Sequence, residues 1–116
     1  MSSIIEEKSF KFAVRIVNLN KHLVSDKKEY VMSKQLLRSG TSIGANVSEA
    51  QRGQSKPDFY AKHSIALKEA NETCYWIRLL HATDYLNDKE YESLYNDANE
   101  LVAILVAIIK SKDKEK

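Results

Sequence analysis

Residues Leu36–Gln51 read LLRSGTSIGANVSEAQ, a stretch whose apolar residues recur at helical spacing although it carries two glycines. Gly40 and Gly44 each lower helix stability by about 1 kcal/mol relative to alanine. Glycines four residues apart share one face of a helix and let another backbone approach closely. A phosphate-binding loop is the alternative, but the stretch matches neither glycine-rich nucleotide motif. We therefore predict that Gly40 and Gly44 mark close packing against a second helix.

Polar residues follow one edge of this stretch at steps of four, four and three: Arg38, Ser42, Asn46 and Glu49. Further along the chain, Glu69 and Glu72 lie at comparable depth in a second helical stretch. A pair between Arg38 and one of these carboxylates would be charge-assisted and would fix the register of two helices. We predict this structural role for the six residues, with contact to a ligand or to nucleic acid as the alternative.

Polar breaks near residues 25–28, 53–57 and 84–88 divide the rest of the chain into four segments. Each segment shows apolar residues at helical spacing; the stripe of the first is Ile5, Ser9, Phe12, Ile16, Leu19 and Leu23. Short connections make neighbouring helices antiparallel. The pattern predicts an all-α fold, an antiparallel up-down-up-down four-helix bundle. We expect a single domain over 1–116, with helices at about 3–24, 27–52, 57–83 and 88–112 and a frayed tail at 113–116.

Three of these segments carry more apolar surface than one bundle needs. A helix that is apolar most of the way round is buried on more than one side. The excess falls outside the core stripes, at Phe10, Val17, Val24, Ile65, Trp76, Leu79, Ile104 and Val106. Scattered surface apolar residues are the simpler alternative. Because the excess recurs in three helices and includes the single tryptophan, we predict that these residues form an interface between copies of the chain.

The composition excludes several classes of protein. With 116 residues, 3 Gly and 1 Pro, the chain cannot easily supply the turns of a β-sandwich. One cysteine cannot form an intrachain disulfide. The N-terminus has acidic residues where an export signal has basic ones, and the longest apolar run, Leu101–Ile109, spans about half a bilayer. We expect a cytoplasmic protein that does not enter a membrane.

No arrangement of residues in the sequence points to catalysis. A di-iron bundle requires Glu-x-x-His twice, and none of the three histidines completes that motif. One cysteine and three scattered histidines are too few for a typical zinc site. We therefore expect a protein that is not an enzyme and that uses no metal or cofactor.

Charge divides the chain into two halves. Residues 1–62 hold 11 Lys and Arg against 6 Asp and Glu, whereas residues 63–109 hold 3 against 8. Attraction between the helices of one bundle is the simplest explanation. Weak contact with nucleic acid is the alternative. Its candidate residues lie on one arc of the first helix and at the C-terminus: Lys8, Lys11, Arg15, Lys110 and Lys112.

The string Gln35–Ala50 resembles the signature of bacterial four-helix bundle proteins encoded in intervening sequences of 23S ribosomal RNA genes, and the later stretch Ala66–Thr73 is also similar to that family. The accessory variability determinant proteins of diversity-generating retroelements are related to it. Those proteins form pentamers and work with a reverse transcriptase and nucleic acid. The resemblance implies that Arg38 and the other five polar residues match recurrent positions of the family. It also implies a homopentamer, with a dimer as the next choice, and RNA, DNA or a reverse transcriptase as partners.

Two functions follow as hypotheses. The first is a homo-oligomeric scaffold or adaptor that binds nucleic acid at most weakly and without sequence preference. The second is a module that docks a partner's helix on its apolar outer faces and has no nucleic-acid role.

Overall fold

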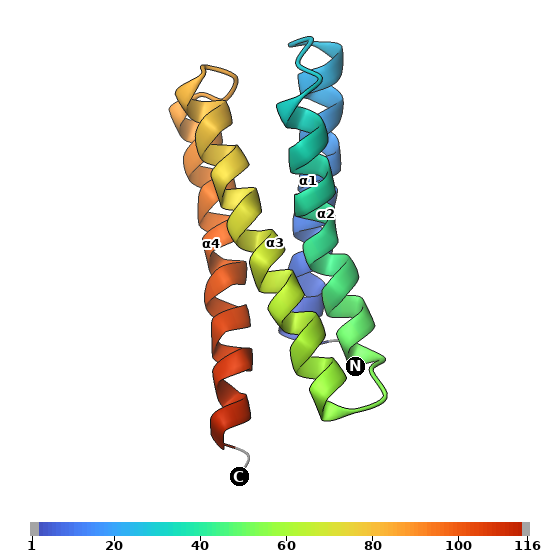
Figure 1. Ribbon diagram of the computed structural model, residues 1–116. Helices are drawn as coiled ribbons and strands as arrows, with labels where there is room; N and C mark the ends of the chain where they lie inside the picture. Colours follow the sequence, from blue (N-terminus) through green and yellow to red (C-terminus); the bar gives the residue numbers. More distant parts are fainter. Residues whose placement is uncertain (1–2, 115–116) are drawn as a thin grey trace.

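The computed structural model describes residues 3–114 and confirms the predicted all-α, antiparallel four-helix fold (Figure 1). The chain runs up and down in four long helices, so the start of the first and the end of the last lie at the same end of the bundle (Figure 1). The elements are α1 (Ile4–Ser25), α2 (Met32–Gln51), α3 (Lys56–Ala82), α4 (Asp88–Lys110) and a 3₁₀ turn, η1 (Ser111–Lys114).

Side-chain caps set the first residue of three helices. Ser3 accepts a hydrogen bond from a first-turn backbone N–H of α1, and Ser55 does the same for α3, where Pro57 occupies the first turn. At α4 the cap is reciprocal, because Asn87 accepts from the N–H of Glu90 while the Glu90 carboxylate accepts from the N–H of Asn87. Such caps satisfy N–H groups that have no partner within the helix.

The second helix begins at Met32 rather than near Lys27, where the sequence pattern placed it. Lys28 has a positive φ of 56°, which ends any continuous helical path from α1. Glu29 follows, and its carboxylate accepts hydrogen bonds from the backbone N–H groups of residues 31–33. The segment is therefore a loop that folds around a buried carboxylate.

Removal of the Glu29 charge is expected to change how stability depends on pH. Burial raises the pKa of Glu29, but its backbone hydrogen bonds to residues 31–33 outweigh burial and lower that pKa overall. A lowered folded pKa adds stability that is complete above the unfolded value, near 4.3, and is lost as the pH falls through the folded value. Glu29→Gln should lower the free energy of unfolding by about 1 kcal/mol at neutral pH. Urea unfolding at a series of pH values should also show a smaller loss of stability on acidification, so that the acid limb of the pH profile is flatter.

Glu92→Gln, which alters an exposed acid of α4, is the matched control and should leave the acid limb unchanged. Equal acid limbs for the Glu29 variant and the unaltered protein would show that this carboxylate does not stabilise the start of α2.

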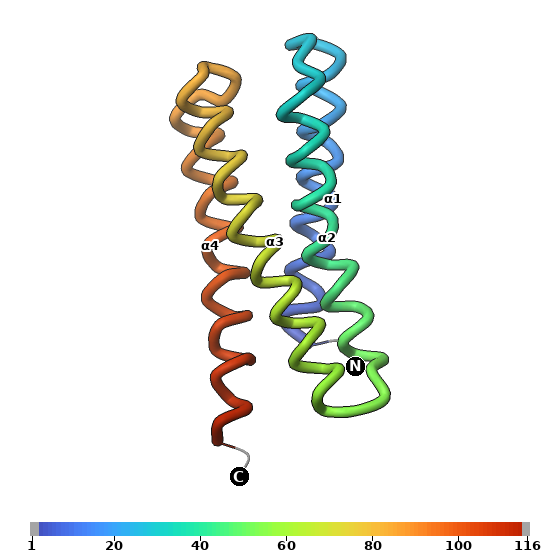
Figure 2. The backbone as a smooth tube through the Cα atoms, viewed as in Figure 1, coloured from blue at the N-terminus to red at the C-terminus, as the bar shows by residue number. Residues whose placement is uncertain are grey.

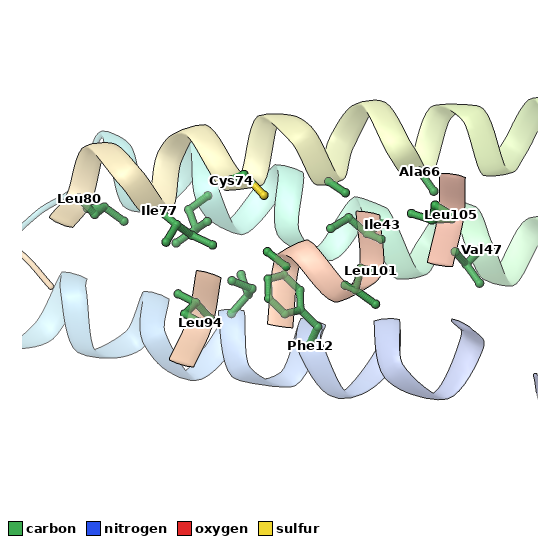
Figure 3. Packing of buried hydrophobic residues seen from close by; sticks show 14 of the residues in the cluster. Phe12, Ile43, Val47, Ala66, Cys74, Ile77, Leu80, Leu94, Leu101 and Leu105 are labelled. Carbon is green, nitrogen blue, oxygen red and sulfur yellow. The ribbon is translucent and has the colours of Figure 1, made fainter. Parts of the chain in front are cut away.

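The four helices enclose one apolar core (Figure 3). Phe12 of α1 lies in this core near Leu94 and Leu101 of α4, and Ile43 of α2 lies close by (Figure 3). All four side chains are almost fully buried. The core runs the length of a bundle that measures 50 × 23 × 21 Å. No helix of the described chain, residues 3–114, combines the length and the apolar character needed to cross a membrane.

Contact between neighbouring helices is uneven. The helix α3 packs closely on both α2 and α4, and it runs diagonally from the α2 side towards the first turns of α4 (Figure 2). The helices α1 and α4 make the least contact of the neighbouring pairs. The bundle is thus two hairpins, α1–α2 and α3–α4, joined mainly along the α2–α3 seam.

The C-terminal end differs slightly from the expected layout. The helix α4 ends at Lys110, and residues 111–114 form a 3₁₀ turn rather than a frayed tail. Tyr60, which is buried on α3, holds this turn, since its hydroxyl lies 3.4 Å from the Ser111 hydroxyl. Residues 115–116 of the expected tail lie outside the described residues.

Candidate functional site

Gly40 and Gly44 of α2 face α1. A Cβ atom at Gly40 would lie 2.8 Å from Cγ1 of Ile16, closer than real Cβ contacts allow. A Cβ at Gly44 would lie 3.2 Å from the backbone oxygen of Ser9. Because Ile16 and Ser9 are both fully buried, the space at the two glycines is filled by α1. The structure therefore places them at a close helix contact and leaves no room for a ligand there.

The opposite edge of α2 carries Arg38, whose guanidinium bridges two carboxylates of α3. One terminal nitrogen donates to Glu69 at 3.2 Å and the other donates to Glu72. Trp76, one turn further along α3, donates its indole N–H to the same Glu72 oxygen at 3.0 Å. The structure thus brings together Arg38, Glu69 and Glu72, and it adds Trp76, which the sequence suggested only as an interface residue.

This cluster is a surface feature. The Arg38 side chain is 50% exposed, whereas that of Glu69 is 14% exposed. The hydrogen bond from Trp76, followed by that from Arg38, lowers the pKa of Glu72 against an opposing effect of burial. The hydrogen bond to Glu72 in turn raises the pKa of Arg38. Water screens a half-exposed pair, so its main effect is to orient the side chains and set the α2–α3 register rather than to add much stability.

The other three polar residues of the α2 edge do not join this cluster. The Ser42 hydroxyl donates to the backbone carbonyl of Arg38, and the Asn46 amide donates to that of Ser42. Glu49 makes a separate ion pair with Lys62 of α3 at 2.8 Å. The polar line predicted along α2 therefore consists of two separate ion-pair contacts on the α2–α3 seam. Between them lie Ser42 and Asn46, which hydrogen-bond to their own helix.

The basic arc of α1 lies against acidic residues of α4. Lys8 pairs with Glu100 at 3.2 Å, and Arg15 pairs with Asp97 at 2.7 Å. With Lys11 they line a shallow hollow of about 280 Å³ between the two helices. Two of the three candidate phosphate contacts on α1 thus already have an acidic partner within the chain. This pairing explains the uneven charge of the two halves as attraction between hairpins.

The two C-terminal candidates lie apart from that arc in the chain. Lys110 is exposed in the last turn of α4. Lys112 lies in η1, and its ammonium is 5.9 Å from the centre of the Tyr60 ring. This distance permits a cation–π contact, which orients Lys112 along the bundle end.

Several of the predicted interface residues are exposed apolar side chains. Phe10 is 70% exposed and Val17 is 37% exposed on α1, and Ile65 is 43% exposed on α3. Val14, which the apolar pattern alone did not single out, is 47% exposed and completes the spacing of 10, 14 and 17 on one face of α1. The remaining members of the predicted set are half-buried: Val24, Trp76, Leu79, Ile104 and Val106. We call Phe10, Val14 and Val17 the α1 face, and Ile65, Trp76 and Leu79 the α3 face.

Two groups with reactive potential lie in the core. Burial raises the pKa of the Cys74 thiol, whose sulfur lies 3.8 Å from the side-chain oxygen of Asn99. His63 is fully buried, and its Nδ1 lies 2.8 Å from the carbonyl oxygen of Phe59. Within residues 3–114, His, Cys, Asp and Glu side chains form no group of three or more that could hold a metal ion.

The fold and these surfaces define the protein as a small antiparallel four-helix bundle with a close α1–α2 contact and exposed apolar faces. The model of the 23S rRNA-intervening sequence protein family matches residues 1–107, and the chain belongs to that family.

A solved structure resembles the whole bundle. It is the crystal structure of a protein of unknown function from the S23 ribosomal protein family of Bacteroides thetaiotaomicron. That protein is 58% identical to this one over 92% of this chain and 99% of its own, with a TM-score of 0.91. No curated protein matches the sequence.

Proposed function

We propose that this protein is a non-enzymatic scaffold or adaptor that assembles with copies of itself through the α1 face and the α3 face. The observation that carries the proposal is the exposure of Phe10, Val14 and Val17 at helical spacing on one side of α1. Three large apolar side chains in a row on one helix face are typical of a buried seam rather than of a solvated surface.

The α3 face has the composition of a binding hot spot. Trp76 lies beside Arg38 through their shared bonds to Glu72, and Ile65 is exposed on the same helix. Tryptophan and arginine are over-represented among the residues that dominate interface energies. The bond to Glu72 fixes the Trp76 ring, so that little side-chain freedom is lost when a partner covers it.

The two faces differ in sequence and lie on helices that are not consecutive. When two unlike surfaces of one protein bind each other, the contact is heterologous and generates either a closed ring or a filament. A ring of five subunits is the arrangement that the resemblance to the retroelement accessory proteins implies, and a dimer is the next choice. The docking of a partner protein's helix on the α1 face is the alternative that the experiment below separates.

The ion pairs on the arc of α1 disfavour the nucleic-acid role that Lys8 and Arg15 suggested. Counterion release scales with the number of phosphates that free cations contact. Both side chains already form ion pairs with acidic residues of α4. The proposed scaffold therefore does not depend on this arc, and RNA, DNA or a reverse transcriptase stay predictions from the resemblance.

Phe10→Glu is expected to weaken self-assembly by roughly tenfold to 150-fold. Burial of a phenylalanine side chain contributes about 1.5–3 kcal/mol, and this is lost when a carboxylate replaces it. Size-exclusion chromatography with light scattering over a range of concentrations would show the shift to smaller species. Asn18→Glu adds the same charge at an exposed position of α1 outside the α1 face and should change nothing.

A purified protein that is monomeric at micromolar concentration would contradict self-assembly and favour the docking of a partner's helix. Equal effects of Phe10→Glu and Asn18→Glu would show that charge, rather than loss of the α1 face, causes the dissociation.

A further inference from the structure

Aromatic rings line the outer side of the α3–α4 hairpin near its loop. His81 of α3 stacks on Tyr91 of α4 with 4.1 Å between ring centres and 12° between planes. Tyr91 stacks in turn on Tyr95 at 5.1 Å and 24°. Three rings in succession form a rigid wall, because each is held by its neighbour and His81 is also held by Asp88 at 2.7 Å.

A hollow of about 320 Å³ lies beside this wall. It is lined by residues of both helices: Tyr75, Arg78, Leu79, His81, Ala82 and Tyr91. Tyr75 is 53% exposed, and its ring meets Trp76 edge to face at 5.1 Å between ring centres. Tyr91 already stacks on His81 and on Tyr95, whereas the exposed Tyr75 ring meets only the edge contact with Trp76, so Tyr75 is the ring of the hollow that we expect to take a further stacking partner.

One arginine lines the hollow although the α3–α4 hairpin is acidic overall. Among residues 3–114 no acidic residue lines it, and the Asp88 carboxylate at its edge contacts His81. Arg78 is exposed, and among residues 3–114 its side chain makes no ion pair or hydrogen bond. Arg78 follows Tyr75 by three residues on the same helix, so the two side chains are neighbours.

We propose that this hollow binds a nucleotide of single-stranded nucleic acid, with the base stacked on Tyr75 and the phosphate paired with Arg78. An aromatic ring beside an arginine is the combination that binds single strands without sequence preference, because every base has a π-face and every nucleotide has a phosphate. A duplex keeps its bases stacked inside, so it offers Tyr75 no base face.

This site goes beyond the proposed scaffold and uses other residues than the arc of Lys8, Lys11 and Arg15. It adjoins the α3 face and shares Leu79 with it, so Tyr75 and Arg78 must stay uncovered in the assembly. Arg78 has no acidic partner among residues 3–114, whereas Lys8 and Arg15 are paired with α4 acids. An acidic peptide is the main competing occupant, since it would also pair with Arg78 but would not need the Tyr75 ring.

The test is a fluorescence-anisotropy titration of the full chain with a labelled oligothymidylate of about 20 nucleotides at about 50 mM salt. A second titration with unlabelled oligomer follows the emission of Trp76, the single tryptophan, next to Tyr75. We expect saturable binding, quenching of Trp76, and loss of affinity by about fivefold or more in Tyr75→Ala and in Arg78→Gln. Tyr75→Phe keeps the ring and should bind normally.

Lys8→Gln and Arg15→Gln are the matched controls on α1 and should change the affinity less than Arg78→Gln does. The proposal is overturned by a lack of binding, by equal affinity for a duplex, or by Tyr75→Ala binding as well as Tyr75→Phe. Displacement of the oligomer by an excess of polyglutamate with no effect of Tyr75→Ala would assign the hollow to acidic peptides instead. Light scattering on each variant measures the mass of the assembly, so that a loss of self-assembly can be told apart from a loss of oligomer binding at this site.

Discussion

Gly44→Leu is expected to force α1 away from α2 and to lower the free energy of unfolding by about 1–3 kcal/mol or more. A Cβ at this position already meets the backbone oxygen of Ser9 at 3.2 Å, and backbone cannot rotate away as a side chain can. The remaining atoms of leucine would then need space that the buried Ser9 occupies. Urea unfolding followed by circular dichroism measures the change. Ala45→Leu, at an exposed position of the same helix, should be close to neutral.

Gly40→Ala provides a second test, because its effect on the free energy of unfolding should change sign with the size of residue 16. In most helices Gly→Ala stabilises by about 1 kcal/mol, but at Gly40 the new methyl would collide with Ile16 at 2.8 Å. Gly40→Ala should therefore destabilise the unaltered protein and become stabilising, or neutral, when Ile16→Ala is also present. A stabilising Gly40→Ala without the second change would show that α1 does not pack closely on this glycine.

Phe12→Ala is expected to lower the free energy of unfolding by about 3–5 kcal/mol. The Phe12 ring is 2% exposed and lies near Leu94 and Leu101, in the seam where α1 and α4 make the least contact. The outer edge of that seam carries the half-exposed ion pairs of Lys8 and Arg15, and charged side chains cannot refill an apolar cavity. Thermal and urea unfolding would measure the loss. Tyr30→Ala removes a ring that is 57% exposed and should cost far less; equal losses would contradict this view of the seam.

Helical periodicity was sufficient to predict the fold because three side-chain caps and one proline act locally. Ser55, Pro57 and Asn87 lie within three residues of the groups they affect, so their spacing in the sequence contains the information. The exception is the start of α2. There the Glu29 carboxylate accepts hydrogen bonds from N–H groups of the residues that follow it. Lys28 has a positive φ although it is neither glycine nor asparagine, so the sequence contains no signal of the turn.

The candidate site was harder to predict because its contacts join different helices. Helical spacing placed Arg38 on the correct edge of α2, but it could not reveal that its guanidinium bridges both Glu69 and Glu72 while Glu49 pairs with Lys62. In the same way, the spacing of Lys8 and Arg15 indicated a basic arc without showing the acids of α4 opposite. Which charges remain free depends on the register between helices, and a periodic pattern on one helix does not specify it.

The aromatic wall illustrates the same difference. His81 and Tyr91 belong to two helices, and their near-parallel stacking follows from the α3–α4 register. Tyr95 follows Tyr91 by one turn on α4, so only that second contact is implied by helical spacing. Val14 was missed for a simpler reason: one small apolar residue adds little to a pattern until its neighbours at 10 and 17 are known to be exposed.

Native mass spectrometry of mixed variants shows whether two unlike faces of the subunit bind each other, as we propose. Phe10→Glu damages the α1 face and Ile65→Glu damages the α3 face, so each variant alone should be largely monomeric at 13.3 kDa. An equimolar mixture retains one intact face of each kind. We expect the mixture to form a heterodimer of about twice that mass, because an intact α1 face binds an intact α3 face and the pair cannot extend further. A mixture that stays monomeric, or an Ile65→Glu variant that assembles fully on its own, would contradict it.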